Sequence, residues 1–322
     1  MIRWLVSALL LALLPGIAVA ASAGAPEIDG WVRQLGDADA LNRLAAGEQL
    51  IKAGDAAKSA LEAAAANGPA AVKPRASLLL AALATESYLI KALNKLHAAE
   101  TLECDMSVTR SHGSFKGHFR GRTDSLRFVS EMNVATTLGN VALRMVGDGT
   151  FVWAESQPAG SDRKLLQKYT ATTMQKMGTT LHLSPLECVR SVRERFWFTE
   201  MRVEKKSAAP DIVFEGRAKD GALEQLLRTV EAIGGPSAAR STRVQQQLMD
   251  RARITFGKDD LQLRSIEILG AEDEPLFSMA LTNVKLDAPI DPQAFVFPIK
   301  DQTPIDMDEQ LKVSKERDGK GD

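Results

Sequence analysis

The most regular pattern of hydrophobic and polar positions lies in residues 101–157. Cys104 and Met106, for example, alternate with charged or polar neighbours, and the following segments repeat this alternation. A period of two places successive side chains on opposite faces of a β-strand. Turn-forming stretches separate the segments, and the clearest is Asp148-Gly149, a strong hairpin signal. The pattern predicts an antiparallel meander with one apolar face.

Residues 26–84 have helical spacing instead, with Ala and Leu recurring every three or four positions. Asp37, Asp55 and the stretch Asn67-Gly68-Pro69 supply the caps and breaks that short helices need. Residues 86–99 predict one further amphipathic helix that leads directly into the first strand.

The rest of the chain predicts further strands and helices. Helices are expected at 183–192, where Pro185 follows Ser184, and at 221–235, where Gly234-Gly235 ends the pattern. Strands are expected at 165–169, 194–206, 211–218, 251–258, 261–269 and 275–286, with a short one at 294–297. The charged tail beyond Met307 is expected to be disordered.

This order of elements predicts an α+β protein with a curved antiparallel sheet of about ten strands, because sheets of that size curl or close. A helix inside the curl would leave an apolar slot. The predicted organisation is a signal peptide at 1–23, a helical segment at 26–84, a β domain at 86–305 and a disordered tail at 306–322.

The first 23 residues have the features of a secretory signal peptide. Arg3 precedes an apolar run that ends before Pro15-Gly16, and cleavage is expected after Ala20 or Ala23. The alternative is an uncleaved anchor, but the run is shorter than the ~20 residues that span a bilayer. No later stretch is expected to cross a membrane. We therefore expect a soluble exported protein, most simply in a bacterial periplasm.

Charge and motifs exclude several functions. Lys and Arg total 40 and Asp and Glu total 41, so no net field favours nucleic acid or an anionic membrane surface. The sequence has no GxSxG, P-loop or GxGxxG motif. His112 and His118 lie near Asp105 without metal-ligand spacing, and Cys188 near His182 lacks a triad. The sequence predicts no enzyme, no cofactor and no metal site.

The two cysteines, Cys104 and Cys188, have two interpretations. An oxidising compartment permits a disulfide between them. Alternatively both are buried thiols, since free cysteine is among the most buried residue types. A disulfide requires a short Cα separation, which the sequence does not give, so both interpretations stay open.

The helical segment 26–84 resembles a HEAT repeat over about one and a half repeats, fewer than the three or so that a solenoid needs. The matching residues are Leu35, Gly36, Asp37, Ala46, Leu50, Gly54, Ala57, Leu61, Arg75 and Ala76. We therefore expect the segment to pack on the β domain as a cap, or on an envelope protein partner.

Residues 86–305 resemble the LolA-like family of periplasmic lipoprotein carriers. The matching residues are Val146, Asp148, Gly149 and Trp153 in a VxDGxxxW pattern, and Ile290, Asp291, Phe295, Phe297 and Pro298 in the closing segment. The resemblance implies an unclosed β-barrel whose concave apolar face, covered by helices, holds acyl chains. It also places Arg122 where the family's carriers have an arginine that helps to hold the lid helices. Thr123 replaces the proline that follows in those carriers.

The predicted ligand site is a hydrophobic cavity on the concave face. Its expected lining is Met106, Phe115, Phe119, Phe128, Leu143, Met145, Trp153 and Met279. Lipid or lipoprotein acyl chains would bind there without catalysis, because each buried methylene contributes about 0.8 kcal/mol without any polar contact. For each of these residues, simple core packing is the alternative. The alternative function is an envelope scaffold that binds a partner through the HEAT-like helices.

Overall fold

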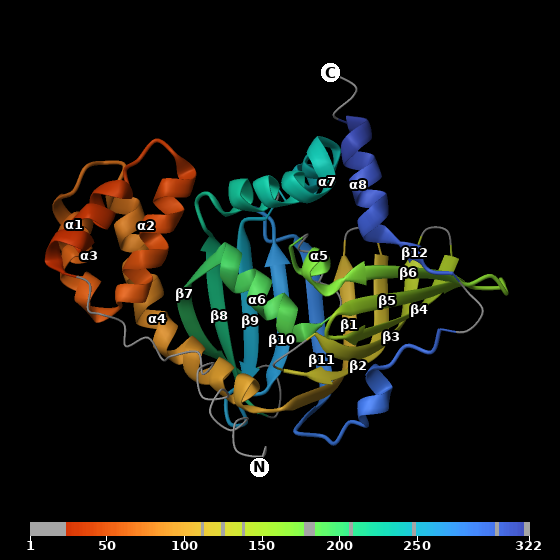
Figure 1. Cartoon of the computed structure of the whole chain (residues 1–322). Coiled ribbons are helices and arrows are strands. Elements are labelled where there is room, and N and C mark those ends of the chain that lie inside the picture. Colours follow the sequence, from red (N-terminus) through yellow and green to blue (C-terminus); the bar gives the residue numbers. More distant parts are fainter. Residues whose placement is uncertain are drawn as a thin grey trace, which may run out of the picture.

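A single sheet of twelve strands forms the centre of the protein, in the order β12-β6-β5-β4-β3-β2-β1-β11-β10-β9-β8-β7 (Figure 1). The computed structural model describes residues 24–110, 113–123, 126–136, 139–176, 184–205, 209–246, 249–299 and 303–318. The predicted signal peptide therefore lies outside the described residues, as do His112 and His182.

The strands follow the predicted alternation closely. They are β1 (Thr101–Arg110), β2 (Gly113–Arg122), β3 (Arg127–Thr136), β4 (Gly139–Asp148), β5 (Phe151–Pro158), β6 (Leu165–Thr170), β7 (Phe196–Glu204), β8 (Asp211–Ala218), β9 (Arg251–Gly257), β10 (Leu263–Leu269), β11 (Pro275–Leu286) and β12 (Ile305–Asp306). The first five, β1 to β5, form the predicted meander, and β6 continues it. The pairing of β12 with β6 is parallel, so the sheet is mixed rather than wholly antiparallel, and it exceeds the expected ten or so strands.

The helices are α1 (Ala25–Gln34), α2 (Ala40–Ala53), α3 (Asp55–Asn67), α4 (Lys73–Ala98), α5 (Ala171–Lys176), α6 (Pro185–Arg195), α7 (Ala222–Gln246) and α8 (Met307–Asp318). Pro185 begins α6 directly after Ser184, as the sequence predicts. Gly235 interrupts α7 with a φ of 80°, a conformation that glycine adopts easily, at the predicted stop.

Two predictions near the C-terminus are wrong. Residues 294–297, predicted as a strand, overlap a 3-10 helix, η2 (Pro292–Phe295), which begins with Asp291 accepting a bond from the Gln293 amide. The tail beyond Met307 is expected from its composition to be disordered, but residues 307–318 form α8, which lies beside α7 (Figure 1). Its high charge allows a solvent-exposed helix, which a composition argument alone cannot separate from disorder.

The helix α4 is continuous over 26 residues, where the sequence predicts a break near residue 85. Its first half, with Leu79, contributes to the core of the helical segment, and its second half, with Leu89 and Leu96, contributes to the core of the sheet. By length and composition α4 would suffice to span a membrane, contrary to the sequence expectation. The two cores account for many of its apolar residues, because a helix that joins two cores needs apolar positions on several sides, although Tyr88 and Ile90 are exposed.

The helices α1 to α3 pack on the sheet domain, as expected of a cap. Trp197 of β7 lies against their core, within 3.2 Å of where a Cβ on Gly47 would be. Asp220 accepts two hydrogen bonds from Arg43, at 2.7 and 2.9 Å, and one from Arg75 at 3.0 Å. Arg43 and Arg75 together hold the pKa of Asp220 below its usual value.

Candidate hydrophobic ligand site

The site is built from rows of cross-strand neighbours on the concave face of the sheet. Residues directly opposite each other on adjacent strands share a face. One row therefore crosses five strands of the sheet with side chains on the same side. Its members are Ile266, Met279, Val108, Phe115 and Val134. A parallel row contains Cys104, Phe119, Ser130 and Met145.

Most of the predicted lining residues lie on this concave face. Six of them belong to one buried cluster with residues of α4 and α6, namely Met106, Phe115, Phe119, Phe128, Met145 and Met279. Leu143 is partly buried and packs against the same cluster. Phe119 and Phe128 stack with ring centroids 6.0 Å apart. The alternation of the strands was sufficient to place these residues on one face.

Trp153 does not line this face, so that prediction is wrong. It is paired with Val146 on β4, whereas the concave residue Met145 is paired with Ala154. Trp153 therefore points to the convex face, where its ring stacks on that of Phe297 with centroids 5.9 Å apart. The two motifs that resemble the carrier family thus contact each other, behind the predicted cavity.

A separate convex cluster surrounds this contact. Its buried members are Val129, Val146, Trp153, Leu166, Phe295 and Phe297. Asp148 fixes the hairpin before Trp153, because its carboxylate accepts bonds from the amides of Thr150 at 2.8 Å and Phe151 at 2.7 Å. The VxDGxxxW pattern and the closing segment therefore pack together on the convex side of the sheet and do not line the predicted cavity.

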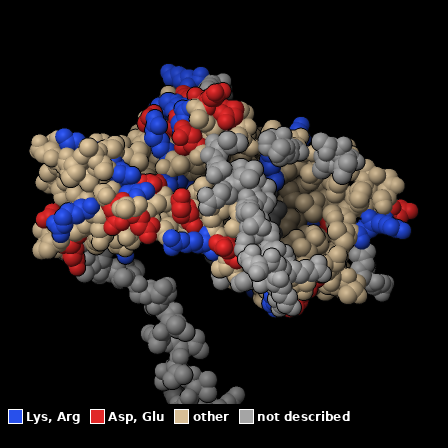
Figure 2. All heavy atoms as spheres, turned by 90° about the horizontal axis from the view of Figure 1, so that it is seen from above, with Lys and Arg blue, Asp and Glu red and all other residues tan. Residues whose placement is uncertain are grey.

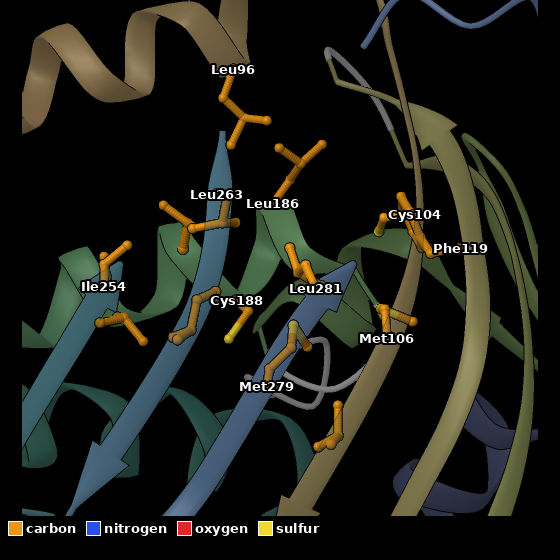
Figure 3. Close-up of a cluster of buried hydrophobic side chains, with 14 of the residues drawn as sticks. Leu96, Cys104, Met106, Phe119, Leu186, Cys188, Ile254, Leu263, Met279 and Leu281 are labelled. Atoms are coloured by element: carbon orange, nitrogen blue, oxygen red, sulfur yellow. The ribbon is translucent and has the colours of Figure 1, made fainter. Parts of the chain in front are cut away.

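Two helices cover part of the concave face. The helix α6 lies across the face in front of β8 to β11, and α4 crosses near the lower ends of these strands (Figure 1). Figure 3 shows Leu186 and Cys188 of α6 and Leu96 of α4 around the same space as Met279 and Leu281. The protein's own side chains therefore fill the concave face on this side.

The other side of the concave face, at β3 to β6, is more open. Along one row, exposure rises from 4% at Met132 through the partly buried Leu143 to 45% at Leu165. Viewed from above, the end of the molecule formed by β2 to β5 shows a hollow with few charged residues (Figure 2). This part of the wall is largely apolar, and the side chains of the described residues cover it only in part.

Cys104 and Cys188 are free thiols in this structure, and both are buried. Burial raises the pKa of each thiol to about 12. Of the two interpretations, the structure therefore has buried thiols rather than a disulfide. At neutral pH they are protonated and behave as small apolar residues of the wall.

Arg122 ends β2, opposite Thr101 of β1. The next residue, Thr123, bonds to the residues that end α4. Its amide donates to the Glu100 carbonyl at 3.1 Å, and its hydroxyl donates to the Ala99 carbonyl. The proline that the carrier family has after the arginine lacks an amide N–H, so it could not make the first of these bonds. Thr123 thus attaches this helix to the sheet.

A cleft of about 640 Å³ lies elsewhere, between α2, α4, α6 and β7. Its walls carry charged side chains that are already paired, such as Arg193 with Glu86 at 2.7 Å and Lys219 with Glu48 at 3.4 Å. Such a lining suits acyl chains poorly, because apolar groups would desolvate these charges. We therefore place the candidate site on the open concave wall.

Sequence reasoning missed two polar residues on the concave face, Arg110 and Ser130. The strand period places Arg110 on the same face as Val108, and its guanidinium lies 5.4 Å from the centroid of the Phe115 ring. Ser130 is fully buried between Phe119 and Met145. The alternation could have revealed both, but polar residues at strand ends and in runs such as Val129-Ser130-Glu131 are normally assigned to the solvent face.

These features define an α+β protein with a large unclosed, curved mixed sheet whose concave apolar wall is partly covered by helices. No protein-family model matches the chain, and no curated protein matches it.

Several solved structures are similar to this chain at a low level. They include an uncharacterized conserved protein from Thermus thermophilus (TM-score 0.37, 9% identity, covering 69% of this chain and 99% of that one). The Pseudomonas aeruginosa MucA/MucB complex also matches (TM-score 0.29, 11% identity, 63% and 59% covered). A LolA superfamily protein from Nitrosomonas europaea is a third (TM-score 0.25, 8% identity, 65% and 97% covered). With identities and TM-scores this low, the function has to be argued from the residues of this chain.

Proposed function

We propose that this protein binds hydrophobic acyl chains, as lipid or lipoprotein, on the open concave wall of β3 to β6. The carrying observation is the row from Met132 through Leu143 to Leu165, which is apolar apart from Ser156 and becomes exposed along its length. Monomeric proteins rarely leave a large apolar surface without a partner. A chain laid along it would contribute about 0.8 kcal/mol per buried methylene.

The sulfur-containing side chains suit such a ligand. Met106, Met132 and Met145 belong to the same concave cluster. Methionine is flexible and polarizable, so it adapts to irregular hydrocarbon surfaces. Binding here needs no catalytic group, which agrees with a carrier or sensor rather than an enzyme.

The proposal includes an exported, periplasmic location, where a lipid carrier or sensor of the envelope would act. It rests on the signal-peptide pattern of residues 1–23 and the resemblance of 86–305 to lipoprotein carriers. The alternative role, an envelope scaffold using the HEAT-like helices, has less support. Among the described residues, none of the strongly exposed large hydrophobic side chains lies on α1, α2 or α3.

A pair of substitutions on adjacent residues of β4 tests the proposal. Leu143→Glu places a charge on the concave wall, whereas Ala142→Glu places the same charge on the exposed convex face one position earlier. Both positions are at least partly exposed, so both variants should fold. Binding of the fluorescent probe N-phenylnaphthylamine is measured by titration. We expect Leu143→Glu to weaken binding about tenfold or more, because a buried charge must be desolvated, and Ala142→Glu to leave it unchanged.

Lipid content and probe binding of the wild-type chain can contradict the proposal. If the purified wild-type chain carries no lipid by native mass spectrometry and does not bind the probe, the concave wall is not a ligand site. Equal weakening by both substitutions would mean that the probe binds by general surface attraction instead.

A further inference from the structure

Arg110 is an unusual residue for an apolar wall. It ends β1 on the concave face, opposite Phe277 on β11, and its guanidinium lies over the Phe115 ring. Its Nε is buried and has no hydrogen-bond partner, and no carboxylate of the described residues pairs with it. Burial lowers the pKa of Arg110 to about 10, so the side chain is still cationic at neutral pH. A partly desolvated cation without a paired anion lowers the stability of the folded protein. The presence of Arg110 in the wall therefore requires an explanation.

The position of Arg110 relative to the wall suggests the reason. It lies beside the row that contains Val108, Phe115 and Val134, which runs from the covered side of the concave face toward the open one. Exposure increases along this row, from 0% at Val108 to the partly buried Val134. An apolar row that opens in this way, with one cation beside it, complements a molecule with one hydrocarbon chain and one anionic end.

We propose that the ligand is a single-chain anionic amphiphile of the long-chain fatty-acid type, with its carboxylate on Arg110 and its chain along the concave wall. This assignment rests on the proposed function and makes it specific. Arginine binds a carboxylate through two parallel hydrogen bonds, which would supply the anion that Arg110 lacks among the described residues. A neutral molecule with a chain of the same length would gain only the apolar contacts with the concave wall.

The test compares two ligands and three proteins at about pH 7.5, well above the pKa of a carboxylic acid. Palmitate and its neutral analogue hexadecanol displace N-phenylnaphthylamine from the wild type, from Arg110→Met and from Arg120→Met. Arg120 is a matched control, because it lies one residue from Phe119 and so faces the convex side. We expect Arg110→Met to weaken palmitate binding about tenfold or more without changing hexadecanol binding, and Arg120→Met to change neither.

A stability measurement separates a ligand-binding role from a structural one. Methionine keeps much of the length of Arg110 without its charge, so thermal unfolding of Arg110→Met without ligand should occur at the same temperature as the wild type or higher. A lower unfolding temperature would indicate that the contact with Phe115 serves folding, and would overturn the assignment.

The failures are distinguishable. If both ligands bind and Arg110→Met weakens them equally or not at all, the fatty-acid assignment is wrong while acyl-chain binding stands. If neither ligand displaces the probe from the wild type, both the assignment and the proposed function fall.

Discussion

The two halves of the concave face share one sequence pattern but have different surroundings. On the covered half, Ile254, Ile266 and Met279 are completely buried under α4 and α6. On the open half, Leu143 and Val134 occupy equivalent rows but are only partly buried. The alternation of apolar residues therefore shows which face is inside, whereas the helices of the same chain decide whether that inside is core or binding surface.

The difference explains why the same kind of residue can have two roles. A side chain on the covered half is held by protein atoms on all sides, as in any close-packed core. One on the open half has hydrocarbon contacts on the sheet side and fewer on the other, so a ligand can supply the remainder. We expect the covered half to determine stability and the open half to determine binding.

The largest effect should come from truncating one residue on each half. Ile254→Ala removes carbon atoms from a fully buried position, so unfolding in urea should show a loss of about 2–5 kcal/mol. Leu143→Ala removes a comparable group from a partly buried position, so its loss should be less than about 1 kcal/mol. Equal losses would contradict the division into core and binding surface.

A smaller effect should follow from Thr123, which attaches the end of α4. Thr123→Ala removes the hydroxyl bond to Ala99, at a cost of about 1 kcal/mol. Thr123→Pro also removes the amide donor to Glu100, so it should cost about 1 kcal/mol more. Urea unfolding of the two variants measures the difference. Proline tolerated as well as alanine would show that the covered half does not depend on this attachment.

Much of this fold was predictable from the sequence because alternation is a local signal. The meander, the helix after Ser184 and the break at Gly235 all follow from neighbouring residues. The errors are those where distant residues decide. The face of Trp153 depends on the register of β4 with β5 and on the segment that carries Phe297.

The candidate site was predictable in part for the same reason. The concave placement of Met106, Phe119 and Met145 follows from strand period and pairing. Which part of that surface α6 covers was not predictable, because it depends on how a helix much later in the chain packs back on the sheet. The surroundings of Arg110 were not predictable either, since only the structure shows that no described carboxylate pairs with it.

The most direct test of the central claim is photo-crosslinking with a palmitate analogue that carries a diazirine at the end of its chain, followed by peptide mass spectrometry. The account predicts adducts on the concave residues of β3 to β5, around Met132, Leu143 and Met145. Adducts on the convex segment around Phe297, or on α1 to α3, would contradict it.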